Sequence, residues 1–73
     1  MDKITKEKVD DMIHRILRQN HTEKGWLELE EDYNKLVKGL SKELENKIID
    51  SGAGEVLYMI CSGIRYEETQ AAS

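Results

Sequence analysis

Three side chains in this sequence belong to the types that bind metals or act as nucleophiles, namely His14, His21 and Cys61. A structural zinc site needs a full set of such ligands at close spacing, and no acidic or cysteine ligand stands at that spacing from either histidine. A cysteine nucleophile needs a base beside it, and the sequence suggests none for Cys61. We therefore expect no metal and no cofactor, and we interpret Cys61 as a small buried hydrophobe.

A second group of chemically capable residues is the acidic run Glu28, Glu30, Glu31 and Asp32. Acid–base catalysis needs a carboxyl group whose surroundings separate its pKa from that of its neighbour. Nearly consecutive positions on a helix point around its axis rather than into one cleft, so the run indicates a solvated face. The alternative is an acidic docking surface for a basic partner.

The segment from Asp50 to Glu55 superficially suggests a phosphate-binding turn, because two glycines open an apolar helical stretch. It lacks the Lys-Ser/Thr pair of a P-loop and a preceding strand, and Glu55 would repel a phosphate. We interpret the segment as a joint between two helical stretches.

The elements that carry these residues show helical periodicity. One apolar stripe predicts a helix over residues 6–19, and it consists of Val9, Met12, Ile13, Ile16 and Leu17. A longer seam, with apolar residues at intervals of three and four, predicts a helix over residues 23–39 that packs against other helices. Its members are Trp26, Leu29, Tyr33, Leu36 and Leu40.

The second half of the chain predicts helices over residues 42–50 and 55–67. Two glycines between them, Gly52 and Gly54, cost a continuous helix about 2 kcal/mol relative to alanines, so we expect a break. The alternative is one bent helix whose glycines permit a close crossing with another helix.

The predicted fold is therefore all-α, a small bundle of three to four short helices. It forms a single domain, residues 1–73, of which residues 69–73 are expected to be a disordered tail.

Composition excludes several classes of function. Charged residues make up 36% of the chain and the net charge is −4. Since Lys and Arg are interspersed with Asp and Glu, this balance opposes nonspecific nucleic-acid binding. No apolar stretch approaches the roughly 20 residues of a membrane span, and no signal peptide is recognisable. The single cysteine is typical of a reducing compartment, so we expect a soluble cytoplasmic protein without a membrane partner.

Four side chains are candidates for anchoring a protein partner: Trp26, Tyr58, Met59 and Tyr66. Trp and Tyr supply large contact areas at low entropic cost, and Met adapts to irregular surfaces. The competing interpretation is that they fill the core. Because a chain of 73 residues encloses only a small core, we expect a surplus of apolar surface near Tyr58, Met59 and Tyr66.

Taken together, these patterns predict a non-enzymatic protein-interaction module that binds and regulates or inhibits a larger protein. In size and acidity alone, the chain is similar to phage-encoded inhibitors of host defence enzymes such as anti-CRISPR proteins, which would place it in the host cytoplasm. The alternatives are a homodimer or larger helical homo-oligomer, and a nucleic-acid-binding transcriptional regulator. The regulator would use Arg15, Arg18 and Lys24, but the acidic start of the second predicted helix disfavours it.

Overall fold

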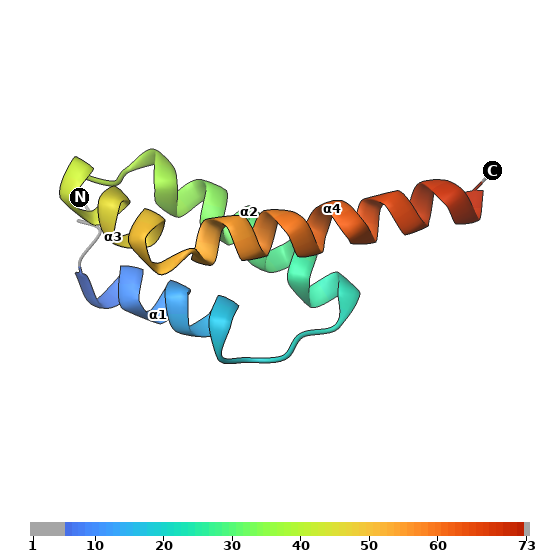
Figure 1. Cartoon of the computed structure of the whole chain (residues 1–73), viewed down its shortest axis with the longest axis horizontal. Coiled ribbons are helices and arrows are strands. Elements are labelled where there is room, and N and C mark those ends of the chain that lie inside the picture. Colours follow the sequence, from blue (N-terminus) through green and yellow to red (C-terminus); the bar gives the residue numbers. More distant parts are fainter. Residues whose placement is uncertain (1–5, 73) are drawn as a thin grey trace.

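A computed structural model describes residues 6–72 and arranges them in four α-helices (Figure 1). The helices are α1 (Lys6–Leu17), α2 (Glu23–Lys38), α3 (Lys42–Ser51) and α4 (Ala53–Ala72). Short turns join them, and residues 6–72 include no strand. The expectation of an all-α bundle is confirmed at the level of fold class, while residues 1–5 and 73 of the predicted domain lie outside the described residues.

Local capping sets the bounds of α2. The Thr22 hydroxyl accepts a hydrogen bond from the backbone N–H of Gly25 at 3.0 Å, which satisfies a donor of the first turn. At the other end, the N–H of Gly39 donates to the carbonyl oxygen of Leu36 and the N–H of Leu40 donates to that of Val37, both at 3.2 Å. These bounds agree with the predicted helix over residues 23–39.

The two apolar patterns of the first half both face the core. On α1, the buried positions are Val9, Met12 and Ile16. On α2, Leu29 is buried, and the seam around it packs against the core while remaining partly exposed. Those partly buried seam residues are Trp26, Tyr33 and Leu36. The seam therefore forms the interior of the bundle, as its three-four spacing predicts.

Helices α3 and α4 are separate elements. The Ser41 hydroxyl accepts from the N–H of Leu44 at 3.3 Å and starts α3. At its end, Gly52 has φ 77°, the left-handed conformation that glycine adopts without a steric penalty. The expected break is confirmed, and the alternative of one bent helix is wrong because Gly52 turns the chain between Ser51 and Ala53.

Helix α4 is longer than the sequence predicted. It begins at Ala53 rather than residue 55 and continues to Ala72 rather than ending near residue 67. The expectation of a disordered tail from residue 69 is therefore wrong up to Ala72. The physical reason is composition: Glu67, Glu68 and Gln70 favour a helix, and no glycine or proline follows Gly63 to end it.

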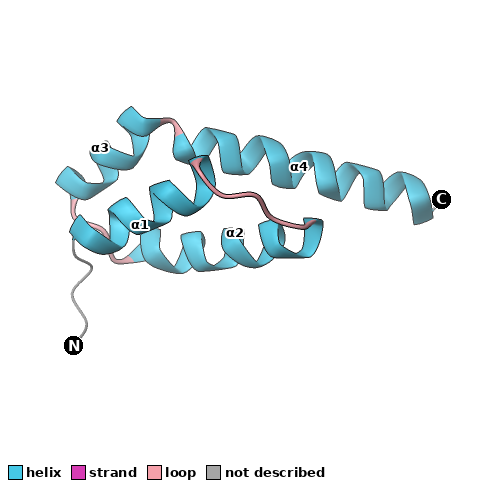
Figure 2. Ribbon diagram, turned by 90° about the horizontal axis from the view of Figure 1, so that it is seen from below, coloured by secondary structure: helices cyan, strands magenta, loops and turns pink. Residues whose placement is uncertain are grey.

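Helices α1, α2 and α3 all pack against α4. Ion pairs link different helices, among them Lys47–Asp10, Arg15–Asp32 and Arg65–Glu30. The C-terminal part of α4 extends past the other helices, as two perpendicular views show (Figures 1 and 2). The molecule is accordingly elongated, with extents of 43 × 24 × 18 Å.

Candidate functional site

Of the histidine and cysteine candidates, His21 and Cys61 make contacts that stabilise the fold. The Nε2–H of His21 donates to the carbonyl oxygen of Arg15 at 2.7 Å, and its ring meets Trp26 edge-on with ring centroids 4.6 Å apart. Cys61 is fully buried, which confirms the prediction of a small hydrophobe, and burial raises the pKa of its thiol. His14 is exposed. Within residues 6–72, no three His, Cys, Asp or Glu side chains lie close enough to share a metal ion.

The acidic run on α2 is half neutralised by basic side chains of other helices. Glu30 pairs with Arg65 of α4, and Asp32 pairs with Arg15 of α1 at 3.6 Å. The other two carboxylates of the run belong to Glu28 and Glu31. Both are exposed, and neither forms an ion pair within the described part of the chain. The same Arg15–Asp32 pair engages one of the three basic residues considered for nucleic-acid binding.

The four candidate anchor residues divide into two groups. Trp26 is only partly exposed, because it packs against the core and its ring also contacts His21. The other three lie in the open, with 68% of Tyr58, 72% of Met59 and 66% of Tyr66 exposed. The structure therefore brings the exposed candidates together on α4, whereas Trp26 belongs mainly to the interior.

The two sides of α4 differ in what covers them. One side is buried in the bundle and consists of Ala53, Leu57, Cys61 and Ile64. We define the outer face of α4 as the opposite side, formed by Glu55, Tyr58, Met59, Ser62 and Tyr66. Because each residue advances about 100° around a helix, positions seven apart return to the same side, as Met59 and Tyr66 do. The spacing that buries Leu57 and Cys61 thus places Met59 and Tyr66 outside.

Small residues occupy the middle of the outer face of α4. Ser62 lies between Met59 and Tyr66, and Gly63 is next to it. A side chain built on Gly63 would meet no atom within 4 Å, so no other helix of the described chain approaches there. Large side chains flanking a small centre permit close approach by another helix, in the way that ridges pack into grooves.

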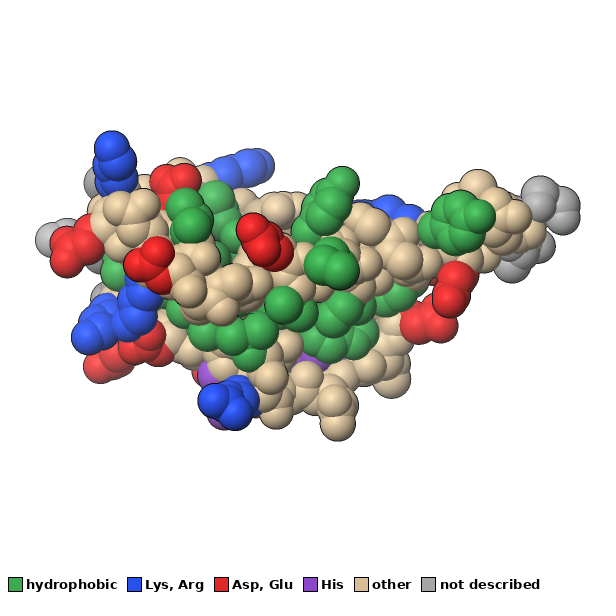
Figure 3. Space-filling model, viewed as in Figure 1, with side chains coloured by type: hydrophobic (Ala, Val, Ile, Leu, Met, Phe, Trp, Pro, Cys, Tyr) green, Lys and Arg blue, Asp and Glu red, His purple; other side chains and the backbone are tan. Residues whose placement is uncertain are grey.

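Sequence reasoning missed part of the exposed apolar surface. Ile49 has 65% of its surface exposed, and Leu17 has 41%. Both belong to apolar pairs of adjacent residues, which point about 100° apart on a helix, so one member of each pair lies nearer the core than the other. Ile48 is buried next to Ile49, and Ile16 is buried next to Leu17. Figure 3 shows hydrophobic side chains along α4 and near the α3 end of the same face.

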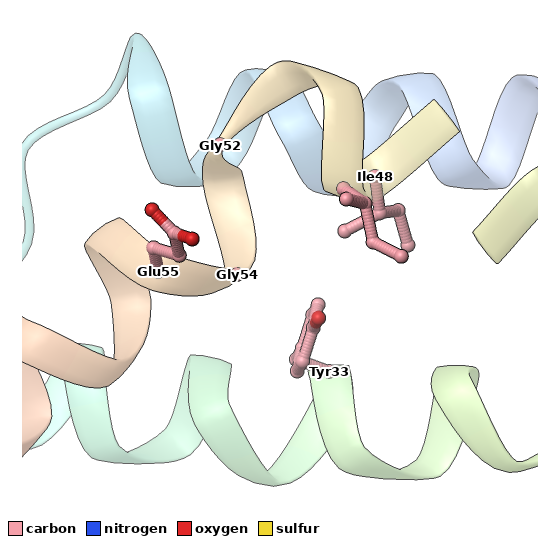
Figure 4. A pocket seen from close by; sticks show the side chains of 6 residues that line it. Tyr33, Ile48, Gly52, Gly54 and Glu55 are labelled. Carbon is pink, nitrogen blue, oxygen red and sulfur yellow. The ribbon is translucent and has the colours of Figure 1, made fainter. Parts of the chain in front are cut away.

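A cavity of about 240 Å³ lies where α2, α3 and α4 meet. Its lining residues are Tyr33, Ile48, Ile49, Gly52, Gly54 and Glu55. Figure 4 shows Tyr33 rising from α2 toward the joint between α3 and α4. A Cβ on Gly54 would lie 2.7 Å from the Tyr33 hydroxyl, so the absence of a side chain there makes room for the phenol. Burial and the nearby Glu45 carboxylate raise the pKa of Tyr33.

Comparison with protein-family models, curated proteins and solved structures finds no match to this chain. No helix within residues 6–72 has both the length and the apolar character needed to cross a lipid bilayer. The functional assignment therefore depends on the geometry of the chain itself, in particular on the outer face of α4.

Proposed function

We propose that this protein is a non-enzymatic interaction module that binds a larger protein through the outer face of α4 and thereby regulates it. The observation that carries the proposal is the exposure of Tyr58, Met59 and Tyr66 on one side of a single rigid helix. Aromatic residues and methionine are enriched in the central part of protein interfaces, which contributes most of the binding energy. A regular helix also holds these side chains at set distances before binding, which lowers the entropic cost of association.

The narrower form of the proposal is inhibition, in which the bound module blocks a functional surface of an enzyme in the cytoplasm, such as a host defence enzyme. The acidic run on α2 offers less support as a docking surface for a basic partner, since Arg65 and Arg15 already pair with Glu30 and Asp32. Inhibition through the outer face of α4 keeps its support because that face is unoccupied by other helices of the described chain.

The proposal is tested by affinity capture from cells that naturally contain the protein. A Met59→Glu/Tyr66→Glu variant places two charges on the outer face, where a partner would have to desolvate them. The matched control, Lys24→Gln/Lys42→Gln, lowers the net charge by the same amount at exposed positions on other helices. Both variants should keep the helical circular dichroism of the parent protein.

We expect a specific partner to be retained by the parent protein and the control variant and to be lost with Met59→Glu/Tyr66→Glu. Undiminished capture by the Met59→Glu/Tyr66→Glu variant would show that the outer face of α4 is not the binding surface. For the inhibitory form, the captured enzyme is assayed with each variant, and inhibition should follow capture. An enzyme that is bound by the parent protein at full activity would refute inhibition and leave only binding.

A further inference from the structure

The cavity between α2, α3 and α4 lies at the beginning of the outer face of α4, because Glu55 belongs to both. The cavity is open to solvent where Ile49 and Glu55 line it, since both residues are exposed. Met59 follows Glu55 about one helical turn later on the outer face. A partner that covers Met59 is therefore in a position to reach the cavity with one of its side chains.

The volume of the cavity suits a single long side chain. At about 240 Å³ it is smaller than the roughly 300–1,000 Å³ of the clefts that hold drug-sized ligands. It is larger than a cavity of about 150 Å³ that holds benzene. The occupant is therefore a group larger than a benzene ring and smaller than a nucleotide or other cofactor, which is the size range of the long amino-acid side chains.

The walls of the cavity combine aliphatic and aromatic surface with two polar groups. Ile48 and Ile49 of α3 supply the aliphatic part, and the Tyr33 ring of α2 reaches toward Ile48 across the cavity (Figure 4). The Tyr33 hydroxyl makes no hydrogen bond within residues 6–72 and remains accessible to solvent. The second polar group is the Glu55 carboxylate, at the start of α4. An occupant that satisfies both polar groups needs an apolar stem and hydrogen-bond donors at its tip.

The electrostatics of the cavity favour a cationic tip. Among the described residues that line it, Glu55 alone is charged, and Glu55 forms no ion pair within residues 6–72. A second carboxylate, that of Glu45 on α3, acts on Tyr33, because burial and this carboxylate together raise the pKa of the phenol. The end of α3 and the beginning of α4 also border the cavity, but their helix dipoles place partial charges of opposite sign there. The carboxylates therefore determine the potential, and they repel an anion.

We propose that the cavity receives an arginine side chain of the protein partner that binds the outer face of α4. This inference rests on the proposed function and names the residue that anchors the partner. The methylene groups of the arginine pack against Ile48 and Ile49. Its guanidinium group donates hydrogen bonds to the Glu55 carboxylate and to the hydroxyl oxygen of Tyr33.

Arginine fits the cavity better than lysine does. Its guanidinium group is planar, carries several N–H donors in a fixed arrangement and stacks on aromatic rings, so it can bind a carboxylate and a phenol together. The ammonium group of lysine is a compact charge that holds its hydration more strongly. Arginine is also enriched among the interface residues that contribute most to binding, and such residues are found in well-packed pockets.

The first test uses capped amino acids as probes of the cavity. Nα-acetyl-arginine methylamide is titrated into the ¹⁵N-labelled full chain, and the corresponding citrulline compound is the control, because it has nearly the same shape without the charge. We expect the arginine compound to shift the amide resonances of Ile49, Gly52 and Gly54 with a dissociation constant of about 1 mM. The citrulline compound should bind at least about tenfold more weakly. Equal binding of the two compounds, or shifts confined to other parts of the chain, would overturn the inference.

The ionisation of Tyr33 gives a second readout. A guanidinium group beside the phenol stabilises the phenolate, so the bound arginine compound should lower the pKa of Tyr33, which is measured by phenolate absorbance. Arginine keeps its charge during this titration because its own pKa is above roughly 12. Tyr33→Phe supplies the signal of the other two tyrosines for subtraction. An unchanged pKa of Tyr33 in the presence of saturating arginine compound would contradict the proposed contact.

A third test connects the cavity to the natural partner. Glu55→Gln removes the charge at nearly constant shape, and it should weaken both the arginine compound and the captured partner by about tenfold. The matched control is Glu28→Gln, which removes an exposed carboxylate of α2 that lies outside the cavity and forms no ion pair within residues 6–72. This control should leave both affinities unchanged, and both variants should keep the helical circular dichroism of the parent protein.

The arginine inference and the proposed function fail in different ways. If Met59→Glu/Tyr66→Glu abolishes capture while Glu55→Gln leaves it undiminished, the partner binds the outer face without an arginine in the cavity, and only the inference is wrong. Binding of the arginine compound combined with undiminished capture by Glu55→Gln would assign the cavity to a free small cation instead. Undiminished capture by Met59→Glu/Tyr66→Glu refutes the outer face as the binding surface, whatever the arginine compound does.

Discussion

At the scale of single residues, the Tyr33 side chain makes two different contacts, one with the core and one with the joint between α3 and α4. It belongs to the core-facing seam of α2, and its hydroxyl reaches the joint between α3 and α4 beside Gly54. The spacing of apolar residues predicted its inward direction, because that direction depends only on the helical period. Its contact with Gly54 joins positions far apart in the chain, so no local pattern could have predicted it.

The raised pKa of Tyr33 leads to a prediction about alkaline pH. Because the phenol has a higher pKa in the folded protein than its ordinary 10.0, the folded state holds the proton more tightly than the unfolded state. Stability is therefore fully present below about pH 10 and falls as pH rises through that value. Urea unfolding should show that the free energy of unfolding falls less between about pH 9 and pH 11 for Tyr33→Phe than for the parent protein.

A second variant separates the two causes of that pKa shift. Glu45→Gln removes the neighbouring carboxylate, which is the smaller cause, so it should reduce the alkaline loss only in part. Identical pH profiles for the parent protein and Tyr33→Phe would show that Tyr33 does not control alkaline stability.

At the scale of elements, helix beginnings were easier to predict than helix ends. Thr22 and Ser41 are the N-caps of α2 and α3 in the structure, and such capping involves residues only a few positions apart. Helix α4 ends later than predicted, because Glu67, Glu68 and Gln70 are residues that favour a helix. Their helix propensity continues α4 to Ala72, beyond the helices that could cover it.

The glycines of the second half should respond to substitution in opposite ways. Gly52→Ala forces a side chain into the left-handed conformation at φ 77° and should lower the free energy of unfolding by about 1–2 kcal/mol. Gly63 lies within α4, and a Cβ added there would meet no atom within 4 Å. Gly63→Ala should therefore raise the free energy of unfolding by about 0.5–1 kcal/mol. Urea denaturation of both variants measures the difference. A stabilising Gly52→Ala would contradict the break between α3 and α4.

At the scale of the whole molecule, stability depends on one small core beneath α4. Leu57 is only 1% exposed, and Leu57→Ala should cost about 2–4 kcal/mol. A domain of this size has few kcal/mol to lose, so the variant should be largely unfolded at 37 °C. Met59→Ala, on the outer face, should change the free energy of unfolding by less than about 0.5 kcal/mol. Thermal denaturation followed by circular dichroism distinguishes the two. Equal losses would mean that both sides of α4 are buried.

The amino-acid sequence by itself determined the class of fold, the joint between α3 and α4, and most of the inward-facing residues of α1 and α2, although Leu17 of the predicted stripe is 41% exposed. Each of these depends on interactions within a few residues or on one clear helical period. Helix α4 is different, because it carries apolar residues on both sides, Leu57 and Cys61 on one and Met59 and Tyr66 on the other. Periodicity alone cannot choose between two apolar sides. Only packing against α1 and α2 decided which side is buried, and it thereby left the outer face of α4 open for a partner.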